Sequence, residues 1–235
     1  MAVRLFVDVD LRPDVQVVLT DNQHHYLAHV MRVQLNDALL LFNGRDGEWK
    51  AVITDISKKK TLLNVVENTR TQDEEKLSDV WLCFSVIKKD NMEFIVQKAT
   101  ELGVSVLQPV ITHRTVVGKV NTDKMRLQAI EASEQCERLS IPLIKDVITL
   151  DNLLKNIDKG RKLYFLDERG SGLDLHLEDK VAYLVGPEGG FDADELKKLR
   201  LFEYGTPLHL GRRILRAETA CLSILSVHNH LSGWR

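Results

Sequence analysis

The sequence predicts an α/β protein, with a small β-barrel at the N-terminus followed by a domain in which strands and helices alternate. The first 70 residues hold several short β-rich runs and a single helical stretch. From residue 80 onward, apolar runs of strand length alternate with helical patterns, which is typical of a parallel sheet covered by helices. Between the two parts, residues 68–76 are polar and lack apolar periodicity. We therefore predict one domain over residues 1–72 and a second over residues 73–235.

The composition is that of a globular chain. Of its 235 residues, 44% are apolar and 28% are charged, and the formal net charge is −2. This charge argues against a protein that coats nucleic acid indiscriminately, although it allows a local basic face. No apolar run approaches the roughly 18 residues of a membrane helix, and the N-terminus lacks the apolar core of a signal peptide. We expect a cytoplasmic protein that has no membrane partner.

The predicted barrel consists of short strands joined by turns. The β-rich runs cover residues 4–7, 15–19, 38–42, 49–53 and 61–66. Residues 43–47, Asn-Gly-Arg-Asp-Gly, have the composition of a hairpin turn. The one helix covers residues 21–31 and carries three histidines. They could bind a metal, but without an acidic or cysteine ligand nearby a polar helix face is the better interpretation, so we expect no metal.

The second domain is predicted to alternate strands with helices. Strands are expected over residues 80–86, 104–111, 163–166, 181–185 and 208–210, and helices over 91–102, 122–139, 193–201 and 217–231. Asp192 and Glu195 have the spacing of a capping box for the third helix. The polar residues of helix 122–139 share one face, and both a surface salt-bridge face and an RNA contact fit them.

Three loops follow predicted strands and are candidates for one site. Residues 186–190, Gly-Pro-Glu-Gly-Gly, and residues 211–216 each precede a helix, and a third loop covers residues 167–172. Ligands of open parallel sheets bind beyond the carboxyl ends of the strands. The first motif is also typical of a simple tight turn. It lacks the Gly-Lys-Ser/Thr ending and the spaced glycines of nucleotide-binding loops, which disfavours a nucleoside triphosphate or NAD.

Several motifs resemble one known family. They are Gly186-Pro187-Glu188-Gly189-Gly190-Phe191, Leu210-Gly211-x-Arg213-Ile214-Leu215-Arg216-x-Glu218-Thr219-Ala220, Met92-Glu93-Phe94 with Gln97-Lys98, His113-Arg114, and Glu134-Gln135 with Arg138. In their order along the chain they are similar to the 16S rRNA (uracil-N3)-methyltransferases, the ribosomal small subunit methyltransferase E family of the SPOUT superfamily. The N-terminal His25-Tyr26-Leu27 and Val30-Met31-Arg32 fit as well, so the resemblance covers essentially the whole chain.

The resemblance implies a fold and an activity. The N-terminal domain would be a PUA-like RNA-binding β-barrel, and the C-terminal domain a SPOUT α/β domain with a deep trefoil knot. The cofactor would be S-adenosyl-L-methionine and the acceptor N3 of a uracil in 16S rRNA, in the assembled small ribosomal subunit. A homodimer is also implied. The apolar residues of the predicted helix 217–231 cover more than one stripe, which fits either a dimer interface or a helix central in its own domain.

The site residues are predicted from the loops and the resemblance together. The cofactor set is Leu166, Glu168, Leu184, Gly186, Pro187, Glu188, Gly189, Gly190, Leu210, Gly211, Ile214 and Leu215. The RNA-binding set is Arg4, Arg32, Lys88, Lys89, Arg114 and Arg138.

We assign catalysis to Arg216, supported by Glu218 and Thr219. A guanidinium would stabilise the negative charge that develops when uracil N3 loses its proton. Glu218 could accept that proton or simply favour the start of the last helix, and Thr219 could contact substrate or cap the helix.

Two other functions fit the same loops. A SPOUT methyltransferase could act on another RNA site or on a ribose hydroxyl, and a module could bind S-adenosylmethionine or RNA without turnover. The sequence points to no other class of enzyme. It has no Ser/His/Asp arrangement, no cysteine nucleophile with a base, and no paired metal ligands at a convincing spacing.

Overall fold

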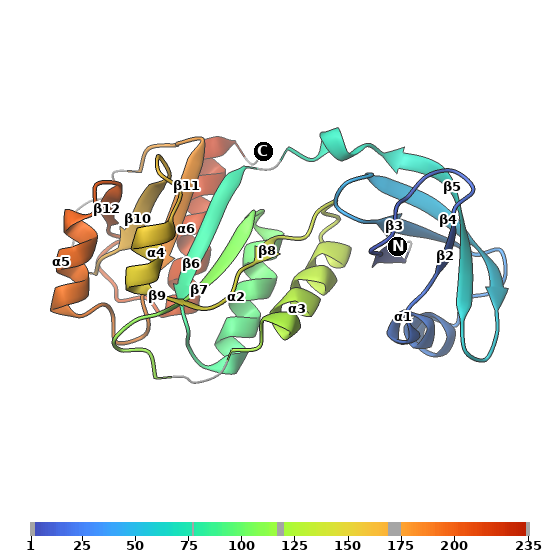
Figure 1. The fold of residues 1–235 in the computed structure, drawn as a ribbon, viewed down its shortest axis with the longest axis horizontal. Helices are drawn as coiled ribbons and strands as arrows, with labels where there is room; N and C mark the ends of the chain where they lie inside the picture. The colour runs from blue at the N-terminus through green and yellow to red at the C-terminus, as the bar shows by residue number, and fades with distance from the viewer. Residues whose placement is uncertain (1–2, 77, 117–119, 169–174, 234–235) are drawn as a thin grey trace. The chain divides into compact units, whose positions relative to one another are not determined.

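The computed structural model describes residues 3–76, 78–116, 120–168 and 175–233. The chain forms two compact units (Figure 1), one of residues 1–76 and 133–141, the other of residues 77–132 and 142–235. Each unit has its own sheet and its own buried core.

A mixed five-stranded sheet builds the first unit. Its strands are β1 (Arg4–Phe6), β2 (Gln16–Val18), β3 (Ala38–Phe42), β4 (Glu48–Ile56) and β5 (Thr61–Arg70). They lie in the order β1-β3-β4-β5-β2, with β1 parallel to β3 and the other neighbours antiparallel. Alternate apolar residues of the strands fill one cluster, among them Leu5, Val17, Leu41, Ile53 and Leu63. The predicted β-rich runs are therefore confirmed.

The turn between β3 and β4 depends on a glycine. Gly47 has a φ of 80°, and a Cβ there would lie 2.2 Å from the carbonyl oxygen of Arg70. The Asn43 side-chain oxygen accepts hydrogen bonds from the backbone N–H groups of Arg45 (3.1 Å) and Asp46 (2.9 Å). The hairpin predicted at residues 43–47 is confirmed.

One helical segment follows β2. It begins as α1 (Asp21–His25) and continues as a π-helix, η1 (Tyr26–Met31). Arg32 ends it in the left-handed conformation, with a φ of 54°. Short π-helical segments are frequent at functional sites.

A buried arginine ties residues 133–141 to the first unit. Arg4 Nε donates to Glu48 Oε2 at 2.5 Å, and its two terminal nitrogens donate to the carbonyl oxygens of Ser133 (2.8 Å) and Arg138 (2.5 Å). The guanidinium also lies 4.0 Å from the ring centre of Phe42. A short 3-10 helix, η2 (Gln72–Glu74), ends the N-terminal part of the unit.

A parallel sheet builds the second unit. Its strands are β6 (Asp79–Ser85), β7 (Val106–Ile111), β8 (Leu143–Ile144), β9 (Ile148–Thr149), β10 (Lys162–Leu166), β11 (Lys180–Val185) and β12 (Gly205–Leu208). The order is β12-β10-β11-β6-β7-β8, with β9 beside β7, and every pair is parallel. The carboxyl ends of β10, β11 and β12 therefore lie side by side at one edge of the sheet.

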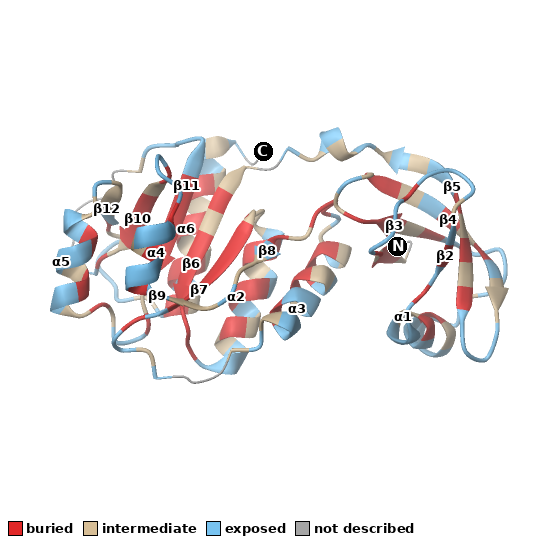
Figure 2. Cartoon of the chain, viewed as in Figure 1, coloured by how far each residue is buried: buried red, intermediate tan, exposed pale blue. Residues whose placement is uncertain are grey.

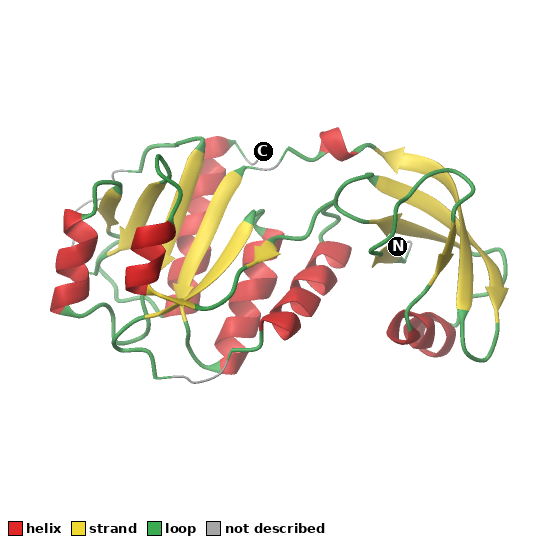
Figure 3. Cartoon of the chain, viewed as in Figure 1, coloured by secondary structure: helices red, strands yellow, loops and turns green. Residues whose placement is uncertain are grey.

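Helices cover both faces of this sheet (Figure 3). They are α2 (Lys89–Glu101), α3 (Thr122–Gln135), α4 (Leu150–Asn156), α5 (Ala193–Leu201) and α6 (Ala217–Ser232). Leu184 of β11 packs in one cluster with Leu153 of α4 and Leu199 of α5. Tyr183, one residue earlier, instead lies 2.8 Å from His228 of α6. Because strand side chains alternate, α4 and α5 cover one face and α6 the other. Figure 2 shows the central strands buried between them.

Parts of this unit differ from the expectation. The predicted helix 122–139 ends at Gln135, since Glu137 has a left-handed φ of 62° that an α-helix does not accommodate. Helix α4 and strands β8 and β9 are too short to show a clear pattern in the sequence. Strand β12 begins at Gly205, before the predicted start at residue 208. Its Pro207 is tolerated because β12 is an edge strand.

The deep trefoil knot implied by the resemblance stays a prediction. Among the residues that the structure describes, no helix combines the length and the apolar character needed to span a bilayer.

Candidate functional site

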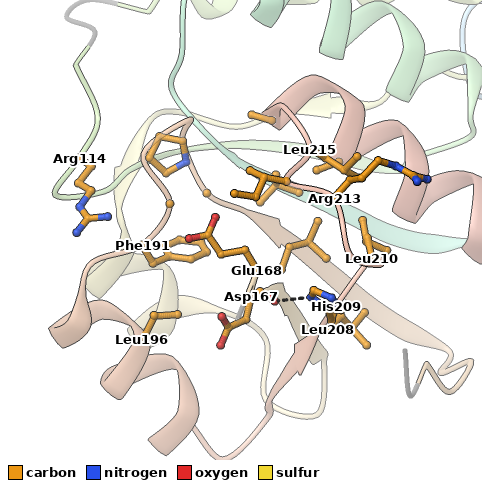
Figure 4. Close-up of a pocket in the computed structure, with 18 of the residues that line it drawn as sticks. Arg114, Asp167, Glu168, Phe191, Leu196, Leu208, His209, Leu210, Arg213 and Leu215 are labelled. Carbon is orange, nitrogen blue, oxygen red and sulfur yellow. Dashed lines mark hydrogen bonds between the residues drawn. The ribbon is translucent and has the colours of Figure 1, made fainter. Parts of the chain in front are cut away.

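A cavity lies where the loops after β10, β11 and β12 meet. Its volume is about 350 Å³, which falls in the range of roughly 300–1,000 Å³ typical of small-molecule sites. Figure 4 shows side chains from all three loops around it. The predicted convergence of the three loops is thus confirmed for the described residues. Of the loop predicted at residues 167–172, residues 169–172 lie outside them.

Backbone shape opens the cavity beside the second loop. Gly190 has a φ of 66°, and a Cβ there would point toward the Glu168 carboxylate at 3.8 Å. A Cβ on Gly186 would lie 3.1 Å from the ring of Phe191, which is buried. Both glycines line the cavity, so they leave room where side chains would otherwise stand.

Two adjacent carboxylates mark the end of β10. Asp167 is buried and accepts a hydrogen bond of 2.6 Å from Arg200, while its carbonyl oxygen lies 3.3 Å from His209 Nδ1. Glu168 is exposed, and Figure 4 shows its carboxylate pointing toward the centre of the cavity. Asp167 therefore stabilises the cavity wall, whereas Glu168 adds a negative charge to the cavity itself.

The start of α5 ties a further segment to the second loop. Asp192 and Glu195 form the predicted capping box, and Glu195 also accepts from the backbone N–H of His113 at 2.8 Å. The hydrogen bond from the Glu195 backbone N–H, helped by the charges of His113 and Arg114, lowers the pKa of Asp192 below its usual range. Arg114 donates to the carbonyl oxygen of Gly189 at 2.5 Å and lines the cavity.

The loop after β12, residues 211–216, presents most of its side chains to solvent. Ile214 is 81% exposed, and Arg216 is exposed too, as the N-cap of α6 that makes no capping hydrogen bond with its side chain. Glu218 is half-buried, and its Oε2 is buried without a hydrogen-bond partner among the described residues. Thr219 is exposed.

Most of the predicted cofactor residues line the cavity. Those that do are Leu166, Glu168, Gly186, Pro187, Gly190, Leu210, Gly211, Ile214 and Leu215. Leu184 does not, because it points to the core between the sheet and α4. Glu188 and Gly189 are exposed and do not line the cavity either. Arg216, Glu218 and Thr219 also lie outside its wall, at the start of the helix that follows it.

Several lining residues were not predicted. The polar ones are Asp167, Arg200, His209 and Arg213, and the larger apolar ones are Phe191, Leu196 and Leu208. Asp167 could have been found, since it follows the same predicted strand as Glu168. Arg200 gives no such signal, because it lies at the end of a helix and reaches the cavity only through the tertiary fold.

Two predicted RNA-binding residues need correction. Arg4 and Arg138 are each 8% exposed. Arg4 is committed to Glu48 and to two backbone carbonyls, and Arg138 lies near Glu75, with Nε 3.9 Å from Oε1, and donates to Ser140. Burial lowers the pKa of Arg138 from its ordinary value. Both side chains therefore stabilise the first unit and are not free to meet a phosphate. The others in the set, Arg32, Lys88, Lys89 and Arg114, are exposed.

Comparison with known proteins finds a family model for each of the two units. Residues 73–229 match the family model of an RNA methyltransferase domain, and residues 19–66 match that of an RNA methyltransferase PUA domain. A ribosomal RNA small subunit methyltransferase E from Rickettsia conorii is 33% identical over 95% of this chain and 93% of its own length. The protein of the same name from Bacillus subtilis is 29% identical over 88% of this chain and 87% of its own.

Solved structures agree over the whole chain. A ribosomal RNA small subunit methyltransferase E from Neisseria gonorrhoeae, bound to S-adenosyl methionine, superposes with a TM-score of 0.89 at 28% identity, covering 98% of both chains. A methyltransferase structure from Legionella pneumophila with bound cofactor SAM gives the same TM-score at 29% identity and covers 98% of both chains. The chain therefore belongs to the ribosomal RNA small subunit methyltransferase E family.

Proposed function

We propose that the protein transfers the methyl group of S-adenosylmethionine to N3 of a uracil in 16S rRNA. The observation that carries the proposal is the single cavity formed by three loops at the carboxyl ends of β10, β11 and β12. Relatives that match over nearly the whole chain carry the small subunit rRNA methyltransferase name, and two similar structures hold the cofactor.

The walls of the cavity suit S-adenosylmethionine. Leu166, Leu208 and Leu210 supply apolar surface for the adenine, and backbone groups of residues 186–190 can hydrogen-bond its edge. Glu168 offers a carboxylate to a positively charged ligand. When bound, the cofactor supplies a methyl group on a sulfonium, and transfer to nitrogen then needs alignment more than acid catalysis.

The residues that follow the loop after β12 suit uracil as the methyl acceptor. Removal of the N3 proton leaves negative charge on the uracil carbonyl oxygens, and Arg216 with the N-terminal amides of α6 can stabilise it. The described residues offer no hydrogen-bond partner to the buried Oε2 of Glu218, which is costly unless the oxygen serves another purpose. This supports Glu218 as the proton acceptor more than as a cap. Thr219 is exposed beside it and can contact the base.

RNA contacts are assigned to the exposed cations. We keep Arg32 in the first unit and Lys88 and Lys89 at the start of α2 for phosphate contacts, which position RNA without reading its sequence. Uracil N3 lies on the pairing edge, so the target base must be unpaired or flipped out. We retain the division into an RNA-binding domain over residues 1–72 and a methyltransferase domain over residues 73–235.

The working state of the enzyme is also proposed. Leu231 of α6 is 48% exposed although the helix buries Cys221, Ile224 and Leu225 in its own unit, which supports a homodimer built on the free side of this helix. We place the enzyme in the cytoplasm, where it acts on the assembled small ribosomal subunit.

Nucleoside mapping tests the proposal. Purified protein is incubated with S-adenosylmethionine and either small ribosomal subunits or protein-free 16S rRNA from a strain that lacks the gene, and the nucleosides are analysed by mass spectrometry. We expect 3-methyluridine at one position, formed best in the subunits. A ribose-methylated nucleoside would establish the alternative methyltransferase. Cofactor binding without any methylated product would indicate a binding module instead.

A further inference from the structure

We infer that Glu195 is a positioning residue, which ties the turn carrying Arg114 to the glycine loop and so holds Arg114 at the mouth of the cofactor cavity. The inference rests on the proposed function, because it gives the tie a role in binding S-adenosylmethionine. The sequence indicates only that Glu195 is the second residue of a capping box, which normally satisfies backbone N–H groups at the start of its own helix.

The segment that is tied is a tight turn at the end of β7. The Thr115 backbone N–H donates to the Thr112 carbonyl oxygen at 3.0 Å, so His113 and Arg114 occupy the two central positions. The Thr115 hydroxyl also accepts from the Thr112 backbone N–H at 2.9 Å. Within the turn, the His113 backbone N–H is left to find its partner elsewhere.

Glu195 supplies that partner from 82 residues further along the chain. Its Oε1 accepts from His113 N–H at 2.8 Å, while its Oε2 accepts from the Asp192 backbone N–H at 3.0 Å. Glu195 is buried, with 7% of the residue exposed, so both carboxylate oxygens lie away from bulk water. One carboxylate therefore caps α5 and fixes the turn after β7 at the same time.

Two further contacts close the connection around Glu195. The His113 ring nitrogen Nδ1 lies 2.9 Å from Asp192 Oδ2, and Arg114 donates to the Gly189 carbonyl oxygen at 2.5 Å. Asp192 in turn accepts from the Glu195 backbone N–H at 2.8 Å. The turn and the glycine loop thus form one braced unit, in which Glu195 is the buried member.

The consequence is preorganisation of a cation. Of the three described arginines that line the cavity, Arg114 and Arg213 are exposed, and Arg200 of α5 is already paired with Asp167. The cofactor carries a carboxylate, which a guanidinium recognises well. Holding Arg114 in place before binding removes the cost of ordering a long side chain and its turn.

A double-mutant cycle measures this coupling. The Kd of S-adenosylmethionine is measured by titration calorimetry on the full chain and on Glu195→Gln, Arg114→Ala and the double variant. We expect each single variant to bind about tenfold more weakly, and the double variant no more weakly than Arg114→Ala alone. Additive losses would show that Glu195 does not act through Arg114 and would overturn the inference.

Thr149→Ala is the matched control for a lost cap. Thr149 caps α4 by accepting from Asn152 N–H at 3.2 Å, and neither residue lines the cavity. Its loss should lower stability as a cap does and leave the Kd unchanged. A tenfold weaker Kd in this control would mean that the effect of Glu195→Gln reflects general destabilisation.

His113→Pro removes the tie and leaves the capping box intact. Proline fits the second position of such a turn but has no N–H to donate to Glu195. His113→Ala loses only the ring, so the difference between the two variants isolates the N–H. We expect proline to weaken binding several-fold more than alanine. Equal Kd values for the two variants would contradict the role of Glu195.

Amide hydrogen exchange measures the hydrogen bond between His113 N–H and Glu195 without any ligand. In the wild type the His113 amide should exchange slowly, and in Glu195→Ala at least tenfold faster, as followed by NMR. Equal exchange would overturn the inference even if the cofactor binds. If the amide is protected but the wild type binds no S-adenosylmethionine, the proposed function fails and the role given to the tie fails with it.

Discussion

The two units of the molecule use arginine in opposite ways. In the first unit, Arg4 is buried against Glu48 and the end of α3 and holds residues 133–141 in place. In the second unit, Arg216 is exposed at the start of α6, next to a cavity that three loops surround. From the sequence alone, Arg4 is predicted to bind RNA and Arg216 to act in catalysis. The structure separates an arginine that stabilises the fold from one that is free to meet a substrate.

The difference lies in what surrounds each side chain. A guanidinium has five N–H groups, and burial is tolerable only when carboxylate or carbonyl oxygens meet most of them. Arg4 finds such oxygens on Glu48 of β4, on Ser133 near the end of α3 and on Arg138, which follows that helix. Arg216 makes no side-chain capping hydrogen bond to the helix that it begins. Its exposure leaves the Arg216 guanidinium accessible to a substrate.

The largest effect is expected for Arg4→Ala. The substitution leaves the Glu48 carboxylate buried without its cation, which typically costs about 3–5 kcal/mol. Urea unfolding followed by circular dichroism would measure the loss. Arg45→Ala is the control in the same unit, because Arg45 forms exposed ion pairs with Asp8 and Asp10, and little change is expected. Similar losses in both variants would remove the distinction between the buried and the exposed arginine.

Arg216→Ala should act on the reaction and hardly on the fold. Single-turnover methylation is expected to fall roughly 100-fold or more, which is the scale of losing one donor that stabilises developing charge. The Kd of S-adenosylmethionine should change no more than a few-fold. Arg212→Ala is the control, since Arg212 is exposed on the same loop and does not line the cavity. A retained rate in Arg216→Ala with normal RNA binding would pass the role to another arginine.

Gly190→Val tests whether backbone shape at the cavity matters. Its left-handed φ of 66° should cost a β-branched residue about 1–2 kcal/mol, and the new side chain would point toward Glu168. We expect the Kd of S-adenosylmethionine to rise well beyond tenfold. Gly160→Val carries a similar strain at φ 94°, with open space around it and outside the cavity wall, and should leave the Kd unchanged. Equal Kd values in both variants would demote residues 186–190 to a simple turn.

The smallest effect concerns a neutral buried pair in the second unit. Burial lowers the pKa of His228 below its ordinary value of 6.5, and the ring pairs with Tyr183, whose pKa burial raises. Below about pH 6.5 the unfolded chain then binds a proton that the folded chain does not, so stability falls as pH falls, by at most roughly 1.4 kcal/mol per pH unit. Urea midpoints between pH 7.5 and 5.5 would measure the slope. A double variant, Tyr183→Phe with His228→Leu, should be less sensitive to pH, and an unchanged slope would assign it to other groups.

The structure also shows that the second domain cannot be isolated by cutting the chain at one position. A fragment that starts near residue 73 keeps residues 133–141 but lacks the part of the first unit with which they pack. Leu139, which is fully buried, would then be exposed. Binding studies on the cofactor site are therefore best done on the full chain.

The sequence by itself determined the order of the longer elements and where the loops after β10, β11 and β12 begin. The short β-rich runs of β3, β4 and β5 indicate strands, because apolar and β-branched side chains fit a pleated, half-buried surface. The glycines at 186 and 190 and the capping box of Asp192 and Glu195 are likewise local signals, and all of them are found in the structure. The family motifs then added the cofactor, the RNA and the activity.

Only the tertiary structure decided which side chains meet. It showed that Arg4 and Arg138 are buried, that Leu184 faces the core, and that Arg200 and His209 reach the cavity wall. It also showed that Glu195, predicted only as part of a capping box, accepts a hydrogen bond from the backbone N–H of His113, 82 residues away. These outcomes depend on contacts between segments that are distant in the chain. A residue's neighbours in sequence fix its backbone preference, but its burial and its partners are set by elements that fold against it.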